Sequence, residues 1–319
     1  MIGENAGTET TDYVVPYGVL AQSGAADVIA VATAPGPIRL MPALQIDPEE
    51  TIESFDARYP DGADYLVVPA VHRQDDPALL GWVAAQAEKG ATIVGVCDGA
   101  WVVAGAGLLR GRRATGHWYS LAALERRFPE THWLRNQRYV VDGTVVTTTG
   151  VTASIPVALA LLDAIAGSER AAAVARELGV ADWSPAHRSD DFRLGAQDVA
   201  TAAGNFLAFW GHEDVGIPVA AGADEIALAL VADAYSRTYR SQAFAVSASP
   251  DSVRTRRGLL LIPDRVAGAS RPPDRMLSPP GALGAVPALD RALAGIADAY
   301  GRASAAFVAL QIEYPHQPF

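Results

Sequence analysis

Short apolar runs rich in β-branched residues alternate with longer segments of mixed polarity along the first half of the chain. The apolar runs predict strands at 27–34, 44–46, 63–69, 91–96, 114–115, 139–141 and 144–148. The segments between them predict helices at 11–22, 77–89, 100–109 and 150–166, with a turn or short helix at 51–55. Strands and helices that alternate at this spacing indicate an α/β fold with a doubly wound, mostly parallel sheet.

The turn between the strand at 91–96 and the helix at 100–109 carries the strongest chemical signal. Residues 95–99 follow the pattern G-x-C-x-G around Cys97, the only cysteine in the chain. Small residues on both sides let the backbone fold back sharply around a nucleophile. The turn also aims the first helical amides at the thiol, which lowers a thiol pKa, whereas the carboxylate of Asp98 raises it. We expect Cys97 to be a nucleophile, and a plain core cysteine is the alternative.

The segment from Cys97 to Trp118, CDGAWVVAGAGLLRGRRATGHW, resembles the nucleophile turn of the ThiJ/PfpI superfamily of glutamine-amidotransferase-like proteins. Three further stretches agree with this resemblance: PGPIRLMPALQIDP at 35–48, TTGVTASIPVALALL at 148–162 and ALQIEYPHQPF at 309–319. The branches most similar to it are isonitrile-hydratase-like enzymes and the sensor domains of AraC-type regulators. The resemblance covers about half of the chain and implies a flavodoxin-like sandwich.

The resemblance also suggests which acid serves the thiol. Many members of the superfamily carry a carboxylate on the first helix at a position that is Gly18 here, so that partner is missing. The hydratase-like branch instead uses an aspartate whose spacing Asp12 matches. Asp12 is therefore the candidate general acid or base, with Glu9 second. A capping or solvated carboxylate is the structural alternative for both residues.

Other residues are expected to line the same site. Backbone N–H donors are expected from Asp98 and from Ala70, Val71 and His72, where the superfamily usually has two glycines. His72 is then a candidate for the pocket wall. His117 resembles the histidine of the family's His-Trp pair and is more often a structural donor than a base. The remaining pocket candidates are Gly99 in the turn and Gly150, Val151 and Thr152 on the closing side.

The chain repeats part of itself without gaps. VATAPGPIRLMPALQIDP, from Val31, matches VSASPDSVRTRRGLLLIPD, from Val246, and this alignment pairs Pro35 with Pro250. No second G-x-C-x-G turn follows the later copy, which continues into one long predicted helix at 288–310. We expect three parts: a ThiJ/PfpI-like domain at 1–167, a helical connector at 168–214, and a degenerate second lobe at 215–319 that packs against the first.

Composition limits the partners. The net charge of −11 argues against a nucleic-acid binder, and the acidic surroundings of RELGVADWS argue against a helix-turn-helix. We find no apolar run long enough to span a bilayer, no signal peptide, and no zinc or phosphate-loop motif. We therefore expect a cytoplasmic protein without a cofactor or membrane contact, or the soluble part of a chain with an upstream anchor. A small molecule is the expected ligand, and a homodimer stays open.

Three functions remain compatible with the sequence. The first is a cysteine-dependent hydratase or amidase acting on a small C–N compound, with Cys97 attacking and Asp12 moving the proton. The second is a ligand-sensing module that keeps the turn without turnover. The third is a redox-sensing thiol, which needs an exposed cysteine with a low pKa. The pKa and the surroundings of Cys97 distinguish them.

Overall fold

The strands of the first lobe form a sheet that is parallel except at one edge, as the alternating pattern predicts. The computed structural model describes residues 1–269 and 271–314. The central strands are β7 (Tyr65–Val68), β8 (Thr92–Gly95) and β12 (Val145–Thr148), and β11 (Tyr139–Asp142) pairs antiparallel with β12. Beyond β7 lie the parallel strands β1 (Ile2–Gly3), β3 (Val31–Ala32) and β6 (Glu50–Thr51). This flavodoxin-like arrangement confirms the predicted fold class.

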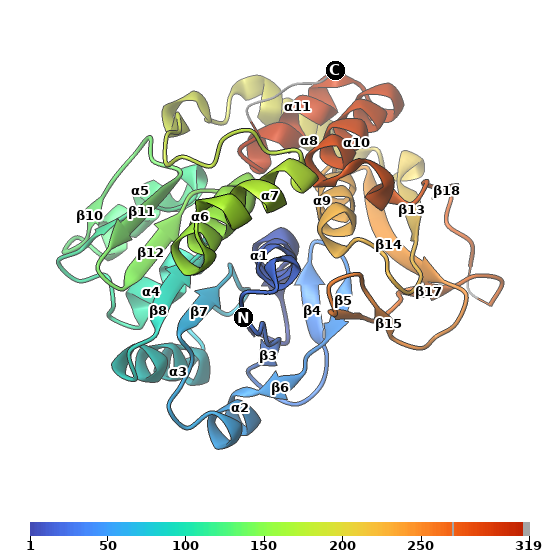
Figure 1. Cartoon of the computed structure of the whole chain (residues 1–319). Helices are drawn as coiled ribbons and strands as arrows, with labels where there is room; N and C mark the ends of the chain where they lie inside the picture. Colours follow the sequence, from blue (N-terminus) through green and yellow to red (C-terminus); the bar gives the residue numbers. More distant parts are fainter. Residues whose placement is uncertain (270, 315–319) are drawn as a thin grey trace.

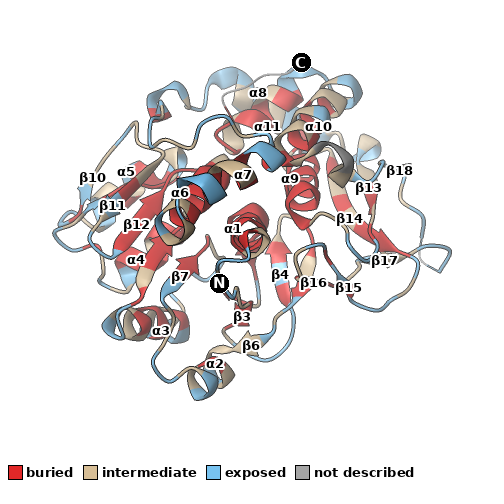
Figure 2. Cartoon of the chain, in the orientation of Figure 1, coloured by how far each residue is buried: buried red, intermediate tan, exposed pale blue. Residues whose placement is uncertain are grey.

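Helices cover both faces of this sheet (Figure 1). One face carries α2 (Ile52–Arg58), α3 (Pro77–Glu88) and α4 (Gly99–Gly105) over a cluster of apolar side chains. The other face carries α1 (Thr10–Ser23) and α6 (Ser154–Ala166). Figure 2 shows α1 buried along nearly all of its length, because helices of both lobes surround it.

The second lobe follows the same order of elements as the start of the first. Its sheet orders β17 (Arg265–Val266), β14 (Ser241–Ser247), β13 (Glu213–Pro218) and β18 (Arg275–Met276), all parallel. The alignment of Pro35 with Pro250, extended backwards, pairs the first residue of α1 with the first residue of α9 (Glu225–Ser236). Extended forwards, it pairs β4 (Ile38–Met41) with β15 (Val253–Arg254) and β5 (Gln45–Asp47) with β16 (Leu260–Leu261).

Equivalent elements of the two lobes meet at the junction between them. Helix α1 packs on α9, and β5 pairs antiparallel with β16. In that ladder Ile46 lies opposite Leu261, its own counterpart in the repeat, so the pairing has the symmetry of a two-fold axis. One apolar cluster runs through both lobes. The lobes therefore share a core, which agrees with the expectation that the second packs against the first.

The closing helices of the two lobes also correspond. In the first lobe α6 is followed by α7 (Ser168–Leu178), and in the second α10 (Ala285–Tyr300) is followed by α11 (Arg302–Gln311). Gly167 and Gly301 separate the members of each pair with nearly the same backbone angles, φ 83° and ψ 161° against φ 88° and ψ 154°. The single helix predicted at 288–310 is therefore wrong, because Gly301 leaves the helical conformation.

Some smaller elements also differ from the expectation. The strand predicted at 27–34 is only the two-residue β3, and β4 was not predicted. The segment 168–214, expected to be a helical connector, contains α7, which packs on α6 and α1 and is therefore counted with the first lobe. It also contains α8 (Ala196–Leu207) and short 3₁₀ turns at Ser189–Asp191 and Phe209–Gly211. Within residues 1–269 and 271–314, no helix has both the length and the apolar character that a bilayer crossing needs.

Candidate functional site

Cys97 lies at the tip of a strained turn between β8 and α4. Its φ of 55° places a non-glycine residue in the left-handed region, which costs on the order of 1–3 kcal/mol and is typical of functional sites. The turn is tight because a Cβ on Gly99 would lie 2.1 Å from the carbonyl oxygen of Val68. The Cys97 N–H donates to Thr148 Oγ1 at 3.1 Å, which ties the turn to the end of β12. The backbone therefore reverses direction sharply at Cys97 and is held in that conformation by Thr148.

The thiol is buried and surrounded by acids. Cys97 is only 6% exposed. Burial raises the pKa of Cys97 well above its usual value, and the carboxylates of Asp12, Asp98, Glu9 and Glu313 add to the shift. The sequence suggested two opposing influences on this pKa, the helix start and the Asp98 carboxylate. In the structure burial is the largest cause of the upward shift, and Asp98 acts in the expected direction.

Asp12 is fully buried at the start of α1 and faces both the loop after β7 and the start of α6. Its Oδ2 accepts from the Ala70 N–H at 3.3 Å, and its Oδ1 accepts from the Ser154 hydroxyl at 3.4 Å. Burial, and then the Glu9 carboxylate, raise the pKa of Asp12 well above its ordinary value. Burial thus favours the protonated form of the Asp12 carboxyl, and the same carboxyl is close enough to Cys97 to influence the charge of the thiol.

Glu9 caps α1 and connects it to the second lobe. Its side chain accepts from the Asp12 N–H at 2.6 Å. Its other oxygen binds Arg237, at the end of α9, at 2.6 Å, and the same guanidinium binds Asp233 at 2.8 Å. Burial opposes the charge of Arg237, but Asp233 and Glu9 keep its pKa above the usual value. Glu9 thus has a capping role and also belongs to a buried ion-pair network that crosses the lobe junction.

Glu313 reaches the site from the end of α11, in the second lobe. Its carboxylate accepts from the Gly150 N–H at 2.5 Å and from the Trp118 N–H at 3.1 Å. His187 Nε2, in the connector, lies 3.6 Å from Glu313 Oε2. Although burial opposes it, His187, His117 and the Gly150 amide lower the pKa of Glu313. Glu313 is therefore a fixed negative charge on the closing side of the thiol.

Val151 and Thr152, the other candidates on the closing side, lie against the segment that carries Glu313. Thr152 donates from its hydroxyl to the Glu313 carbonyl at 2.9 Å and from its N–H to the Ile312 carbonyl at 3.1 Å. Val151 is buried beside it. The last five residues of the ALQIEYPHQPF stretch lie outside the described residues. Its first part nevertheless shows that the second lobe supplies one wall of the thiol site.

His117 has a structural place. It caps α5 (Trp118–Arg127), accepting from the Tyr119 N–H at Nδ1, 3.3 Å away, and its Nε2 lies 3.1 Å from the Gln311 carbonyl. Since Nδ1 accepts, the ring proton is on Nε2 and donates to that carbonyl. Both nitrogens are engaged, which favours the structural interpretation of His117 over a base.

Asp98 occupies the N-cap position of α4, but its side chain makes no capping hydrogen bond. Its Oδ2 accepts from the Ser120 hydroxyl at 2.8 Å, while its Oδ1 is buried and has no hydrogen-bond partner among the described residues. Burial raises the pKa of Asp98, against His117 and the Ser120 hydroxyl, which lower it. Asp98 is thus a second buried carboxyl close to the thiol.

The loop after β7 uses its backbone groups for structure. The Ala70 N–H is bound to Asp12, Val71 bridges to Thr8, and the His72 N–H donates to the Gly7 carbonyl at 2.8 Å. The His72 side chain is exposed to solvent. The structure therefore brings Asp12, Asp98, Glu9 and Glu313 close enough to influence the charge of Cys97, and Gly150 contacts the site through Glu313. The exposed His72 imidazole is not among the groups that act on the thiol.

Gly18, where the superfamily often has its carboxylate, lies at the crossing of α1 and α9. A Cβ there would be 2.5 Å from the Ile226 side chain. A larger residue at this position is excluded by the second lobe. The sequence did not identify Arg237, Glu313 or His187 as site residues, and the only available signal was the tail motif around Glu313.

Comparisons with known proteins agree with this geometry. The DJ-1/PfpI family profile matches residues 2–164. Isonitrile hydratase of Pseudomonas putida is 31% identical over 198 residues, which cover 60% of this chain and 80% of the hydratase. The HTH-type transcriptional regulator CdhR of Pseudomonas aeruginosa is 35% identical over 128 residues, 40% of this chain, and the match spans only 36% of the regulator.

A solved structure shows the same fold. Drosophila melanogaster DJ-1beta superposes with a TM-score of 0.51 at 20% identity, covering 57% of this chain and 96% of the fly protein. At this identity the likeness concerns the fold alone. The family profile, however, spans half of the chain, and the alignment covers four fifths of the hydratase. The chain belongs to the DJ-1/PfpI family.

Proposed function

We propose that the thiol site catalyses the addition of water to a small compound with a carbon–nitrogen multiple bond, an isonitrile being the best fit. The observation that carries the proposal is that Cys97, on its strained turn, is electrostatically coupled to the buried carboxyl of Asp12, whose pKa burial raises. The similarity to an isonitrile hydratase over most of that enzyme's length supports the substrate class.

A neutral thiol beside a neutral carboxyl suits this substrate. The terminal carbon of an isonitrile carries a lone pair, so it must gain a proton as well as a nucleophile. The Asp12 carboxyl donates its proton to that carbon, the Cys97 sulfur forms the S–C bond, and the thiol proton returns to Asp12. The product of this step is a thioimidate, R–N=CH–S–Cys97.

Water completes the reaction. It adds to the thioimidate carbon with Asp12 accepting and returning a proton, and the S–C bond then breaks. The sulfur regains its proton and the substrate leaves as the formamide, R–NH–CHO. The net change is R–NC plus water to R–NH–CHO, with no oxidation or reduction. The four acids around the thiol make a free thiolate unfavourable, so proton transfer accompanies attack.

The test is to incubate the protein with n-butyl isonitrile and follow N-butylformamide by NMR. We expect turnover that falls by at least about 10³-fold in Cys97→Ala and strongly in Asp12→Asn, since the two residues act as a unit. Asp251→Asn, at an exposed carboxylate far along the sequence, is the matched control and should keep full activity. Formamide production that persists in Cys97→Ala would overturn the mechanism.

Ligand sensing without turnover is the second candidate function. The raised pKa of Cys97 favours it, because such a thiol is a poor nucleophile by itself and a poor redox sensor. The similarity to the regulator CdhR points the same way, although the match spans about a third of that protein. Absence of formamide, together with stabilisation of the wild-type fold by the isonitrile, would support sensing over hydration.

A further inference from the structure

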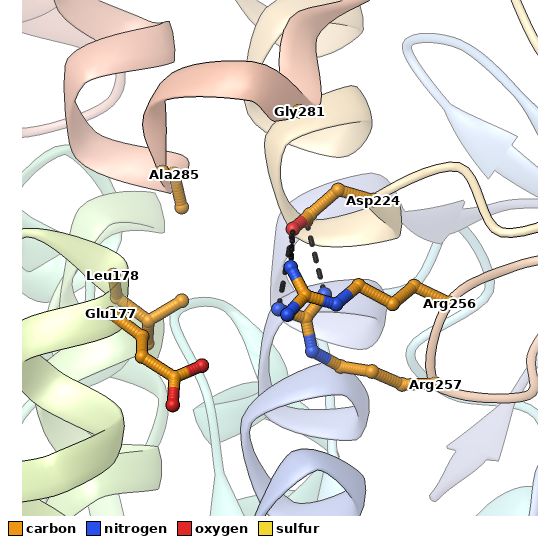
Figure 3. Close-up of a pocket in the computed structure, with 8 residues that line it drawn as sticks. Glu177, Leu178, Asp224, Arg256, Arg257, Gly281 and Ala285 are labelled. Atoms are coloured by element: carbon orange, nitrogen blue, oxygen red, sulfur yellow. Dashed lines mark hydrogen bonds and ion pairs between the residues drawn. The ribbon is translucent and has the colours of Figure 1, made fainter.

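We propose that the second lobe holds its own ligand site, separate from Cys97, for a small molecule that carries both a carboxylate and an ammonium group, such as an amino acid. The site is a cavity of about 440 Å³, within the range of small-molecule pockets. Figure 3 shows its walls, which come from both lobes: Glu177, Leu178, Asp224, Arg256, Arg257, Gly281, Gly284 and Ala285.

The cavity occupies the place in the second lobe that the thiol site occupies in the first. Asp224 caps α9 as Glu9 caps α1, and the repeat aligns these two capping residues. The alignment of the closing helices, which pairs Gly167 with Gly301, also pairs Gly150 with Gly284, before α10. It likewise pairs the end of α7, at 177–178, with the end of α11, at 311–312. Each lobe therefore contributes the end of its last helix to the site of the other.

The difference between the two places explains why a cavity exists. In the first lobe β8, the Cys97 turn and α4 fill the space in front of the closing helix. In the second lobe the described chain between β17 and the 3₁₀ turn η4 (Pro280–Leu283) contains only the short strand β18. No strand–turn–helix unit enters the corresponding space in this stretch, so it stays open.

One wall of the cavity is a rigid, charged support. The Arg257 side chain is 5% exposed and donates to Gln22 at 2.7 Å and to the two oxygens of Asp224 at 3.0 and 3.3 Å. Asp224 also accepts from two amides at the start of α9, those of Ile226 and Ala227, at 3.1 Å. Because all of these groups are paired, Arg257 and Asp224 position the wall rather than bind a ligand.

Among the described residues that line the cavity, Arg256 is the cation held most loosely, by a single ion pair with Asp224. Its side chain is 54% exposed, and its Nη1 lies 3.6 Å from Asp224 Oδ2, longer than a hydrogen bond. Figure 3 shows this guanidinium next to Asp224 at the cavity. A planar guanidinium with unused donors binds carboxylates in a bidentate manner. We assign the ligand carboxylate to Arg256.

Glu177 supplies the opposite charge from the opposite wall. It comes from α7 of the first lobe, and Gln22 Nε2 donates to its Oε2. In Figure 3 its carboxylate extends into the space across from the two guanidiniums. A ligand with a single charge is attracted by one of the two side chains, Arg256 or Glu177, and repelled by the other. An amino acid carries both charges and is attracted by both side chains. This complementarity of sign gives the site its specificity.

The experiment measures thermal unfolding of the full chain with each proteinogenic amino acid. A concentration of about 5 mM largely saturates a site with a Kd near 1 mM. Propionate and n-propylamine are the single-charge comparisons. We expect at least one amino acid to raise the Tm of the wild type and of Cys97→Ala alike, and neither single-charge compound to do so.

Two variants then locate the binding by calorimetry. Arg256→Ala and Glu177→Gln alter exposed side chains, so the fold should survive. Each should raise the Kd at least tenfold, as expected for losing a charged hydrogen bond worth about 1.5–3 kcal/mol. Arg254→Ala, an exposed arginine bonded to the Gly258 carbonyl, is the matched control. The proposal fails if no amino acid shifts the Tm, if both variants bind normally, or if binding disappears in Cys97→Ala.

Discussion

The two lobes place different chemistry at corresponding positions. In the first, Cys97 is a buried thiol with four acidic side chains near it. In the second lobe, as far as the structure describes it, no such turn occurs, and an open cavity has arginines on its wall. The shared frame of α1, α9 and the closing helices therefore accommodates different side-chain chemistry, and what differs is the segment inserted between the strands.

The largest expected effect comes from a substitution where α1 crosses α9. Gly18→Glu would restore the superfamily's carboxylate but would force a charged side chain against Ile226, 2.5 Å from the new Cβ. Overpacking and an unpaired buried charge should destabilise the fold by at least about 5 kcal/mol, as seen in denaturant unfolding. Gly204→Ala, in the exposed part of α8 with open space around it, should be neutral or slightly stabilising. A stable Gly18→Glu protein would mean that the lobes do not share this junction.

A smaller effect is expected from the ion-pair network. Arg237→Ala leaves Glu9 and Asp233 buried without their partner and should cost about 3–5 kcal/mol. Arg58→Ala, at the ion pair between the exposed Arg58 and Glu50, should leave the free energy of unfolding nearly unchanged, because water screens such a pair. Equal losses in the two variants, measured by urea unfolding, would contradict the importance of the inter-lobe network.

Stability should also depend on pH through Asp233. Burial, partly offset by Arg237, raises the pKa of Asp233 from 3.8 to about 7. The folded protein therefore binds a proton that the unfolded chain has lost, so its stability is highest below about pH 4 for this group and falls as pH rises to about 7. Asp233→Asn should reduce the loss between about pH 5.5 and 7.5 by on the order of 1–2 kcal/mol. The free energy of unfolding is measured with urea at the two pH values. If it changes between them by the same amount in wild type and in Asp233→Asn, the assignment is refuted.

The smallest expected effect concerns the thiol itself. Glu313→Gln removes one of the carboxylates that raise the pKa of Cys97, and the amide can still accept one backbone hydrogen bond. Alkylation of Cys97 by iodoacetamide should therefore shift to lower pH. Glu177→Gln, the matched change at the second site, should leave the alkylation profile unchanged. If the alkylation profiles of wild type and Glu313→Gln are identical, the charge of Glu313, and with it the second lobe, has no influence on the pKa of Cys97.

The sequence predicted the local parts of this molecule and missed the parts that join distant segments. The Cys97 turn was predictable because Gly95 and Gly99 flank it directly and a Cβ on either would clash. Asp12 was suggested by the resemblance to the hydratase-like branch, and its effect on the pKa of Cys97 agrees with a place near the thiol. By contrast, Glu313 meets Trp118 across 195 residues and Arg237 meets Glu9 across 228, and no local pattern encodes such contacts.

The pKa of Cys97 could likewise not be predicted from the local sequence. A helix start favours a thiolate, but the net pKa of Cys97 depends on burial and on acids that folding brings in from distant segments. The split of the predicted helix at 288–310 has a similar origin. The sequence there is largely helix-favouring, and only the conformation of Gly301 marks the break.

The contact of the segment after α11 with the first lobe also determines when the thiol site is complete during synthesis. A ribosome completes the Cys97 turn long before it adds Glu313, and chains generally fold from the first segments available. The nascent first lobe therefore carries an unfinished thiol site until α11 emerges. The wall that Glu313 supplies can therefore form only after α11 has been synthesised.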